Sequence, residues 1–173
     1  MGGFPAGERV VGPEARVQHA RDVAWGLLNR RDRTEAELRR VLADKRVEPS
    51  DADLVLGELR GGGYVDDARY ARTFAEDRRR LDAWGADRIE RKLRSLGIDA
   101  EDVEAALAEQ DEGSEFDAAV ALLARRFPEL GPGGPEVTAK ARDRALGVLV
   151  RKGYGLELAY DALRRHAGAD PVD

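Results

Sequence analysis

Residues that could perform catalysis or hold a metal ion are few and scattered in this sequence of 173 residues. It contains no cysteine and two histidines, His19 and His166, neither of which has HExxH-type spacing to a partner. A cysteine nucleophile, a thiolate zinc site and a disulfide scaffold are therefore excluded, and a histidine metal centre is disfavoured. We expect both histidines to lie at the surface or at a helix end.

Two glycine-rich stretches and one pair of carboxylates are the other candidates for chemistry. Neither 61–63 nor 131–134 fits the GxxxxGK[ST] or GxGxxG patterns of phosphate-binding loops, so both predict turns. Asp66 and Asp67 are adjacent, and adjacent residues do not face each other on a helix, so capping explains them better than acid–base catalysis. The sequence therefore predicts a protein that is not an enzyme and has no cofactor.

Basic side chains are the remaining chemical signal. The 29 Lys and Arg residues against 34 Asp and Glu residues give a formal net charge of −5, which argues against a general nucleic-acid binder but leaves local basic stripes. Helical periodicity places several cations opposite apolar faces, although pairing on a solvated face or complementing a helix dipole would also explain many of them. The candidate contacts to a partner or to DNA are Arg39, Arg40, Arg78, Arg79, Arg88, Arg91, Arg94, Lys140, Arg144, Arg151 and Lys152.

The elements that must position these cations are helices. Apolar residues recur at spacings of three and four, with no sustained alternation, so we expect an all-α fold of about nine helices. The first helix is expected from about residue 15. Start signals typical of helix caps open three later helices, at Thr34 with Glu37, Ser50 with Asp53, and Ser114 with Asp117.

An internal repeat indicates how the helices are grouped. The spacing of Leu93, Gly97, Ile98, Val103 and Leu107 recurs in Leu149, Gly153, Tyr154, Ala159 and Leu163. We expect an elongated array of three three-helix units, 17–66, 67–112 and 113–168, with tails at 1–16 and 169–173. The first unit has arginine at 46 where the others have glycine, and about two extra residues before Leu54, an expected core residue of its third helix, so its turn is expected to differ.

The setting of the protein follows from what the sequence lacks. The absence of cysteine fits a reducing compartment, and no apolar run approaches the roughly 20 residues of a membrane span. We expect a cytoplasmic protein that does not contact the membrane and is a monomer.

Four stretches in order along the chain resemble the RecX family, regulators of the bacterial recombinase RecA. They are RTEAEL at 33–38 with Leu42, GYVDDARYA at 63–71, Gly85 with Ile89, Leu93, Gly97 and Ile98, and RKGY at 151–154. The resemblance spans about residues 17–166. Most matched positions are expected core and turn residues, so no contact site is carried over from the family.

The resemblance implies a modulator without enzymatic activity of its own. It would bind RecA and RecA–DNA filaments and mostly inhibit strand exchange, coprotease action and ATP hydrolysis, in DNA recombination, DNA repair and the SOS response. The acidic composition departs from the more basic members and weakens any implied direct DNA binding. A helical-repeat protein that binds DNA without the recombinase is the alternative.

Overall fold

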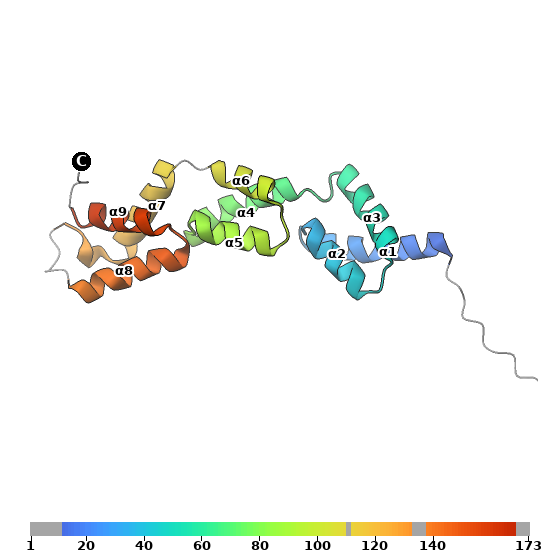
Figure 1. Cartoon of the computed structure of the whole chain (residues 1–173), viewed down its shortest axis with the longest axis horizontal. Coiled ribbons are helices and arrows are strands. Elements are labelled where there is room, and N and C mark those ends of the chain that lie inside the picture. Colours follow the sequence, from blue (N-terminus) through green and yellow to red (C-terminus); the bar gives the residue numbers. More distant parts are fainter. Residues whose placement is uncertain (1–11, 110–111, 133–137, 169–173) are drawn as a thin grey trace, which may run out of the picture. The chain divides into compact units, whose positions relative to one another are not determined.

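The computed structural model describes residues 12–109, 112–132 and 138–168, and these contain nine α-helices, one 3₁₀ turn and no strand (Figure 1). The predicted all-α fold is confirmed. The helices are α1 (Pro13–Leu28), α2 (Glu35–Asp44), α3 (Pro49–Gly61), α4 (Asp67–Asp82), α5 (Ala86–Ser95), α6 (Ala100–Ala108), α7 (Glu112–Arg126), α8 (Ala139–Lys152) and α9 (Leu156–His166), and the 3₁₀ turn is Pro128–Leu130.

The chain divides into two compact units, Met1–Asp66 and Asp67–Asp173. In the first, α1–α3 enclose one hydrophobic cluster that includes Leu38, Leu42 and Leu56. The second contains two clusters, one among α4–α6 and one among α7–α9. Each cluster is enclosed by three consecutive helices. We propose that these three groups of helices are the three repeats predicted from the sequence, two of which lie in the second compact unit. Most of the expected tail, 1–11, and all of 169–173 lie outside the described residues.

Of the three helix starts predicted from capping side chains, the one at Thr34 is confirmed. Thr34 forms the predicted capping box, in which its hydroxyl accepts from the Glu37 backbone N–H and the Glu37 carboxylate accepts from the Thr34 N–H. The predicted starts at Ser50 and Ser114 are wrong, because α3 begins at Pro49 and α7 at Glu112.

Proline explains two of the shifted boundaries. Both α1 and α3 have proline in the first turn, at Pro13 and Pro49, and neither has a side-chain hydrogen bond at its N-cap. Proline has a fixed helical φ and lacks the N–H that would be unpaired there, so it starts a helix without a capping side chain. Residues 13–16 are therefore helical rather than part of a tail.

The expectation that the turn after the second helix differs is wrong. Arg46 has φ +60°, in the left-handed region that Gly97 (φ +82°) and Gly153 (φ +92°) occupy at the equivalent turns. In all three turns the following N–H donates to the carbonyl five residues earlier: Val47 to Leu42, Ile98 to Leu93, and Tyr154 to Leu149. Arginine thus adopts the backbone that glycine takes freely, at a cost of roughly 1–2 kcal/mol.

The expectation of two extra residues before Leu54 is wrong, because Ala52 rather than Leu54 takes the equivalent buried position when these turns are aligned. α3, α6 and α9 each begin three residues after the positive-φ residue of the turn, and Ala52, Val103 and Ala159 occupy equivalent buried positions. Leu54, which the spacing assigned to the core, is instead 51% exposed. The three turns therefore set one common register for the helices on either side of them.

A seam of hydrogen bonds joins α4 and α5 to the end of α8 within the second unit. The Gly85 N–H donates to the Lys152 carbonyl at 2.9 Å, and the Asp87 N–H donates to the Gly153 carbonyl at 3.1 Å. A Cβ on Gly85 would overlap the Gly153 backbone, and a Cβ on Gly153 would overlap Arg88. Glycine is therefore required here because two backbones approach closely.

Candidate partner-binding surface

Three of the eleven candidate cations have structural roles inside the second unit. Lys152 donates to the Asp82 carbonyl at 2.5 Å, at the end of α4. Arg79 donates to the carbonyls of Ala106 and Leu107, at the end of α6, and burial lowers the pKa of its guanidinium. These two cations complete helix C-termini, where unpaired carbonyls and the dipole favour positive charge.

Arg88 is the third of these cations. Its guanidinium lies 4.1 Å from the centroid of the Trp84 ring and donates to the Arg151 carbonyl at 3.1 Å. Arg78 packs against the same tryptophan and against Phe74, and its carboxylate partner is Asp82 at 2.5 Å. Both arginines are therefore engaged by aromatic faces as well as by polar partners.

Three further candidates are exposed but form ion pairs on their own surface. Arg94 pairs with Glu90 at 2.9 Å, and Arg144 lies 3.5 Å from the Glu129 carboxylate. Arg39 binds both Glu35 and Asp53, and the hydrogen bond to Asp53 raises the pKa of its guanidinium. Such exposed pairs contribute little to stability, so these arginines can exchange partners at small cost.

Four candidates are exposed and have no ion pair among the described residues: Arg40 on α2, Arg91 on α5, and Lys140 and Arg151 on α8. Arg142, on α8, shares these properties, and the sequence analysis did not select it. In the sequence Arg142 stands beside an acidic residue, Asp143, so it does not stand out as part of a basic stripe. The packing of α8 against α9 places Arg142 at a groove between the two helices.

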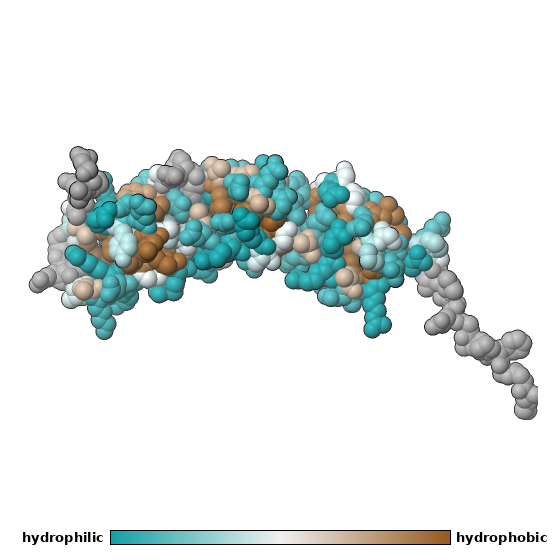
Figure 2. Space-filling model, viewed as in Figure 1, coloured by the Kyte–Doolittle hydropathy of each residue, from teal (hydrophilic) through white to brown (hydrophobic). Residues whose placement is uncertain are grey.

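The seam brings the cations of α8 near those at the start of α5 within the second unit. Lys140, Arg144 and Arg151 lie on one side of α8, since their helical angles agree within about 40°. The hydrogen bond from Arg88 to the Arg151 carbonyl brings the end of α8 to the start of α5, where Arg91 follows one turn later. Figure 2 shows a hydrophilic surface over α5. We call Lys140, Arg144 and Arg151 on α8, together with Arg91 on α5, the basic row. Its side chains can bind carboxylates or phosphates.

A groove between α8 and α9 is the main feature that the sequence analysis missed. It has a volume of about 500 Å³ and is lined by Ala139, Arg142, Asp143, Leu146, Tyr160, Leu163, Arg164 and Ala167. Figure 2 shows hydrophobic residues gathered between these two helices. Tyr160 is 48% exposed. The sequence indicates this groove only through the apolar residues at 139, 146 and 150. Their helical spacing places them together on a side of α8 away from the basic row.

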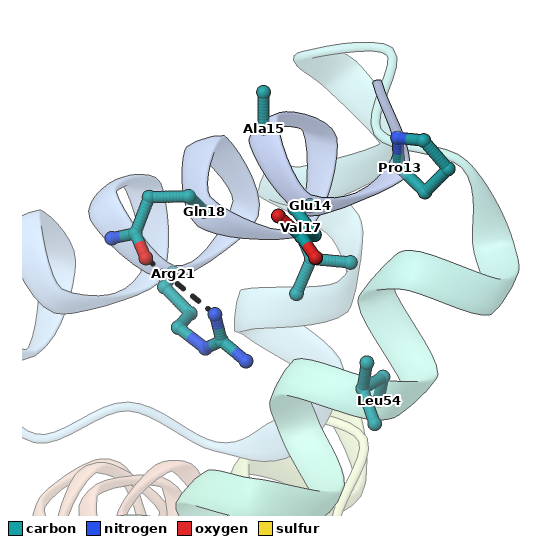
Figure 3. Close-up of a pocket in the computed structure, with 7 residues that line it drawn as sticks. All are labelled: Pro13, Glu14, Ala15, Val17, Gln18, Arg21 and Leu54. Atoms are coloured by element: carbon teal, nitrogen blue, oxygen red, sulfur yellow. Dashed lines mark hydrogen bonds between the residues drawn. The ribbon is translucent and has the colours of Figure 1, made fainter. Parts of the chain in front are cut away.

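A second, shallow pocket lies between α1 and α3 in the first unit. Its lining includes Val17, Gln18, Arg21 and Leu54 (Figure 3). The Arg21 guanidinium points toward Gln18 and is held by Glu58 through bonds of 2.8 and 2.7 Å. Arg21 and Gln18, two of the polar side chains at this pocket, are thus already hydrogen-bonded within the protein.

The described part of the chain contains no group of three or more His, Asp and Glu residues placed to hold a metal ion. The histidines fit the expected positions: His19 is exposed, and His166 is the last residue of α9. His166 is nonetheless buried, with Nε2 2.9 Å from the Phe127 carbonyl oxygen. None of the helices in the described ranges is long and apolar enough to cross a membrane.

The described residues define an all-α protein in which consecutive helices enclose hydrophobic clusters and charged side chains lie on the exposed faces. Residues 20–59 match the family described as "RecX, first three-helix domain", and residues 66–107 match "RecX, second three-helix domain". A protein of Amycolatopsis mediterranei named "Regulatory protein RecX" is 32% identical over 161 residues, covering 91% of this chain and 90% of its own. One of the same name in Mycolicibacterium smegmatis is 34% identical, covering 92% and 85%. The chain belongs to the RecX family of regulatory proteins.

Solved structures agree on the fold. The crystal structure of RecX from Lactobacillus salivarius superposes with a TM-score of 0.76 at 17% identity, covering 88% of this chain and 97% of that one. A second crystal structure of a regulatory protein RecX gives a TM-score of 0.72 at 20% identity, covering 95% and 81%.

Proposed function

We propose that this protein binds the RecA recombinase and its DNA filament and inhibits its recombination, coprotease and ATPase activities. It acts in DNA repair and the SOS response, in the cytoplasm, as a monomer without catalysis of its own. The observation that carries the proposal is the match to proteins named "Regulatory protein RecX" over about nine-tenths of both chains.

The basic row supplies a physical means of binding. Arg91, Lys140 and Arg151 are exposed cations without ion pairs among the described residues, so they can bind carboxylates of filament subunits without first losing an internal partner. Each such contact is weak, but several made at once to a repeating filament add through effective concentration. Binding in the filament groove would exclude the DNA duplex and protein substrates.

The test of this function is the single-stranded-DNA-dependent ATPase rate of RecA, titrated with this protein at two salt concentrations. We expect inhibition at well below one molecule per recombinase monomer, because one bound molecule affects several subunits. Unchanged ATPase rates at a full equivalent would contradict the proposal.

Charge reversal tests the basic row itself. The double variant Lys140→Glu, Arg151→Glu is expected to need about tenfold more protein for half-inhibition, since each lost contact and added repulsion weakens binding. Arg30→Glu, at an exposed cation of the first unit, is the matched control and is expected to inhibit as the wild type does. Equal inhibition by the double variant and the control would remove the row from the interface.

The basic row also favours one alternative, direct binding to DNA. Phosphate contacts release counterions, so this alternative predicts that DNA mobility shifts without the recombinase and that the affinity falls steeply with salt. Salt-sensitive DNA binding together with unchanged ATPase rates would favour the alternative. The net charge of −5 argues against it.

A further inference from the structure

Several residues that line the groove between α8 and α9 stand at positions equivalent to residues of the first unit that form ion pairs. The common register of the left-handed turns at residues 46 and 153 makes four lining residues equivalent to four residues of α2 and α3. These pairs of equivalent positions are Arg142 with Glu35, Leu146 with Arg39, Tyr160 with Asp53, and Ala167 with Arg60.

In the first unit these four positions satisfy one another. Arg39 binds both Asp53 and Glu35, and Arg60 binds Glu35 at 2.9 Å. This cluster links α2 to α3 on the outer surface. The fold therefore accommodates a closed set of charges at these positions, and nothing in its packing requires an apolar surface there.

In the α7–α9 part of the second unit the same positions form no ion pair within the ranges that the structure describes. Tyr160 is 48% exposed, and Val150, one turn along α8 from Leu146, is 43% exposed. Arg142 is exposed at the groove with no ion pair among the described residues. An exposed apolar strip with an unpaired cation beside it is typical of a surface that a partner covers.

The charge of the groove lining indicates the chemistry of that partner. The lining contains two arginines, Arg142 and Arg164, and one carboxylate, Asp143. Arg164 forms an exposed ion pair with Asp161, which it can exchange for another carboxylate at small cost. A second copy of this chain would bring the same two arginines against these, so an acidic partner fits better.

We propose that the α8–α9 groove binds an acidic amphipathic helix of another protein. Leucine or aromatic side chains of that helix lie on Leu146 and Tyr160, and a carboxylate pairs with Arg142. The groove, of about 500 Å³, has room for side chains of that helix. This inference goes beyond inhibition of the recombinase, because the groove lies away from the basic row on α8 and does not require a filament.

The test uses the full chain and a fluorescein-labelled helical peptide of about four turns, built of glutamate and leucine in helical spacing. We expect saturable binding by fluorescence anisotropy and amide shifts confined to α8 and α9. The same peptide with lysine for every glutamate is expected to bind at least about tenfold more weakly. Absence of binding, equal binding of the lysine peptide, or shifts on other helices would overturn the proposal.

The decisive variant is Leu146→Arg with Tyr160→Asp, which places in α8 and α9 the ion pair that the first unit forms between Arg39 and Asp53. We expect peptide binding to weaken by about tenfold or more with the helical circular dichroism unchanged. Tyr160→Ser, at a half-exposed site, gives the same readout if the double variant unfolds. Leu81→Ser, at a residue 65% exposed on α4, is the control. Wild-type affinity in a folded groove variant, or equal loss in the control, would overturn the proposal.

Discussion

At the scale of single residues, backbone conformation and close approach decide what a position tolerates. Gly63 and Gly153 both have positive φ, at +72° and +92°. A Cβ on Gly63 would meet nothing within 4 Å, whereas one on Gly153 would overlap the backbone and Cβ of Arg88. Replacing these two glycines with a larger residue is therefore expected to cost different amounts of folding stability, because only Gly153 also lies against a neighbouring helix.

The first prediction compares alanine at these two glycines. Gly63→Ala is expected to lower the free energy of unfolding by about 1 kcal/mol, from backbone strain alone. Gly153→Ala is expected to lower it by about 3 kcal/mol or more, because Arg88 must also move and the seam is disturbed. Urea denaturation measures both, and equal losses would show that the close approach at Gly153 does not matter.

The second prediction concerns Arg46, which has φ +60° with a side chain that is exposed. Arg46→Gly is expected to raise the free energy of unfolding of the first unit by about 0.5–1 kcal/mol, since relief of strain exceeds the greater entropy of glycine in the unfolded chain. Lys45→Gly, at the preceding exposed residue with φ −84°, is the control and is expected to destabilise. Thermal unfolding of the two variants gives the sign.

At the scale of elements, capping side chains and internal ion pairs determine how each helix is held. The α2 start is a buried network in which Glu37 accepts from the Thr34 N–H and binds Arg31 at 2.7 Å. Burial opposes ionisation of Glu37, but the hydrogen bonds from Arg31 and Thr34 and the nearby Arg33 together hold the pKa of its carboxyl below the usual range.

The third prediction is the pH dependence that this carboxyl gives. Because its pKa is lowered by folding, its contribution to stability is fully present above the unfolded pKa of about 4.3 and is lost as the pH falls through the folded value. Glu37→Gln is therefore expected to destabilise most near pH 7 and progressively less toward pH 3. Urea denaturation across this range measures the difference, and Glu48→Gln, at an exposed N-cap without a side-chain bond, is the control.

At the scale of the whole molecule, the chain consists of two compact units, and the second contains two hydrophobic clusters. The seam from Gly85 to Gly153 and the Lys152 bond to Asp82 connect the elements around those two clusters. Residues 70 positions apart are thereby held together. Opening either half of this unit exposes the polar groups of the seam, so α4–α9 should unfold cooperatively.

The fourth prediction tests that cooperativity by hydrogen exchange. Lys152→Met is expected to lower the opening free energy of slow amides in both α4–α6 and α7–α9 by about 1–2 kcal/mol, because the Asp82 carbonyl loses its charged donor. Lys140→Met, at an exposed residue that forms no ion pair within the described part of the chain, is the control, and amides of α1–α3 should not change. A loss confined to α7–α9 would show that the seam does not couple the two halves.

The sequence alone determined the helical class and the repeat of turns, because both depend on local spacing. Apolar residues three and four apart specify a helix, and the Gly97 and Gly153 turns follow from a local backbone requirement. The Thr34–Glu37 box was predictable for the same reason. The Arg46 turn was not, since neighbouring hydrogen bonds impose a backbone that arginine itself disfavours.

Tertiary structure decided which cations are free and which are engaged. Periodicity placed Arg88 and Arg151 alike on outer faces, but long-range contacts hold Arg88 against a carbonyl and a tryptophan ring and leave Arg151 exposed. The groove at Leu146 and Tyr160 likewise became evident only when α8 and α9 were packed together. Helical periodicity gives the direction of a side chain from its own axis, whereas its partner depends on packing between elements distant in sequence.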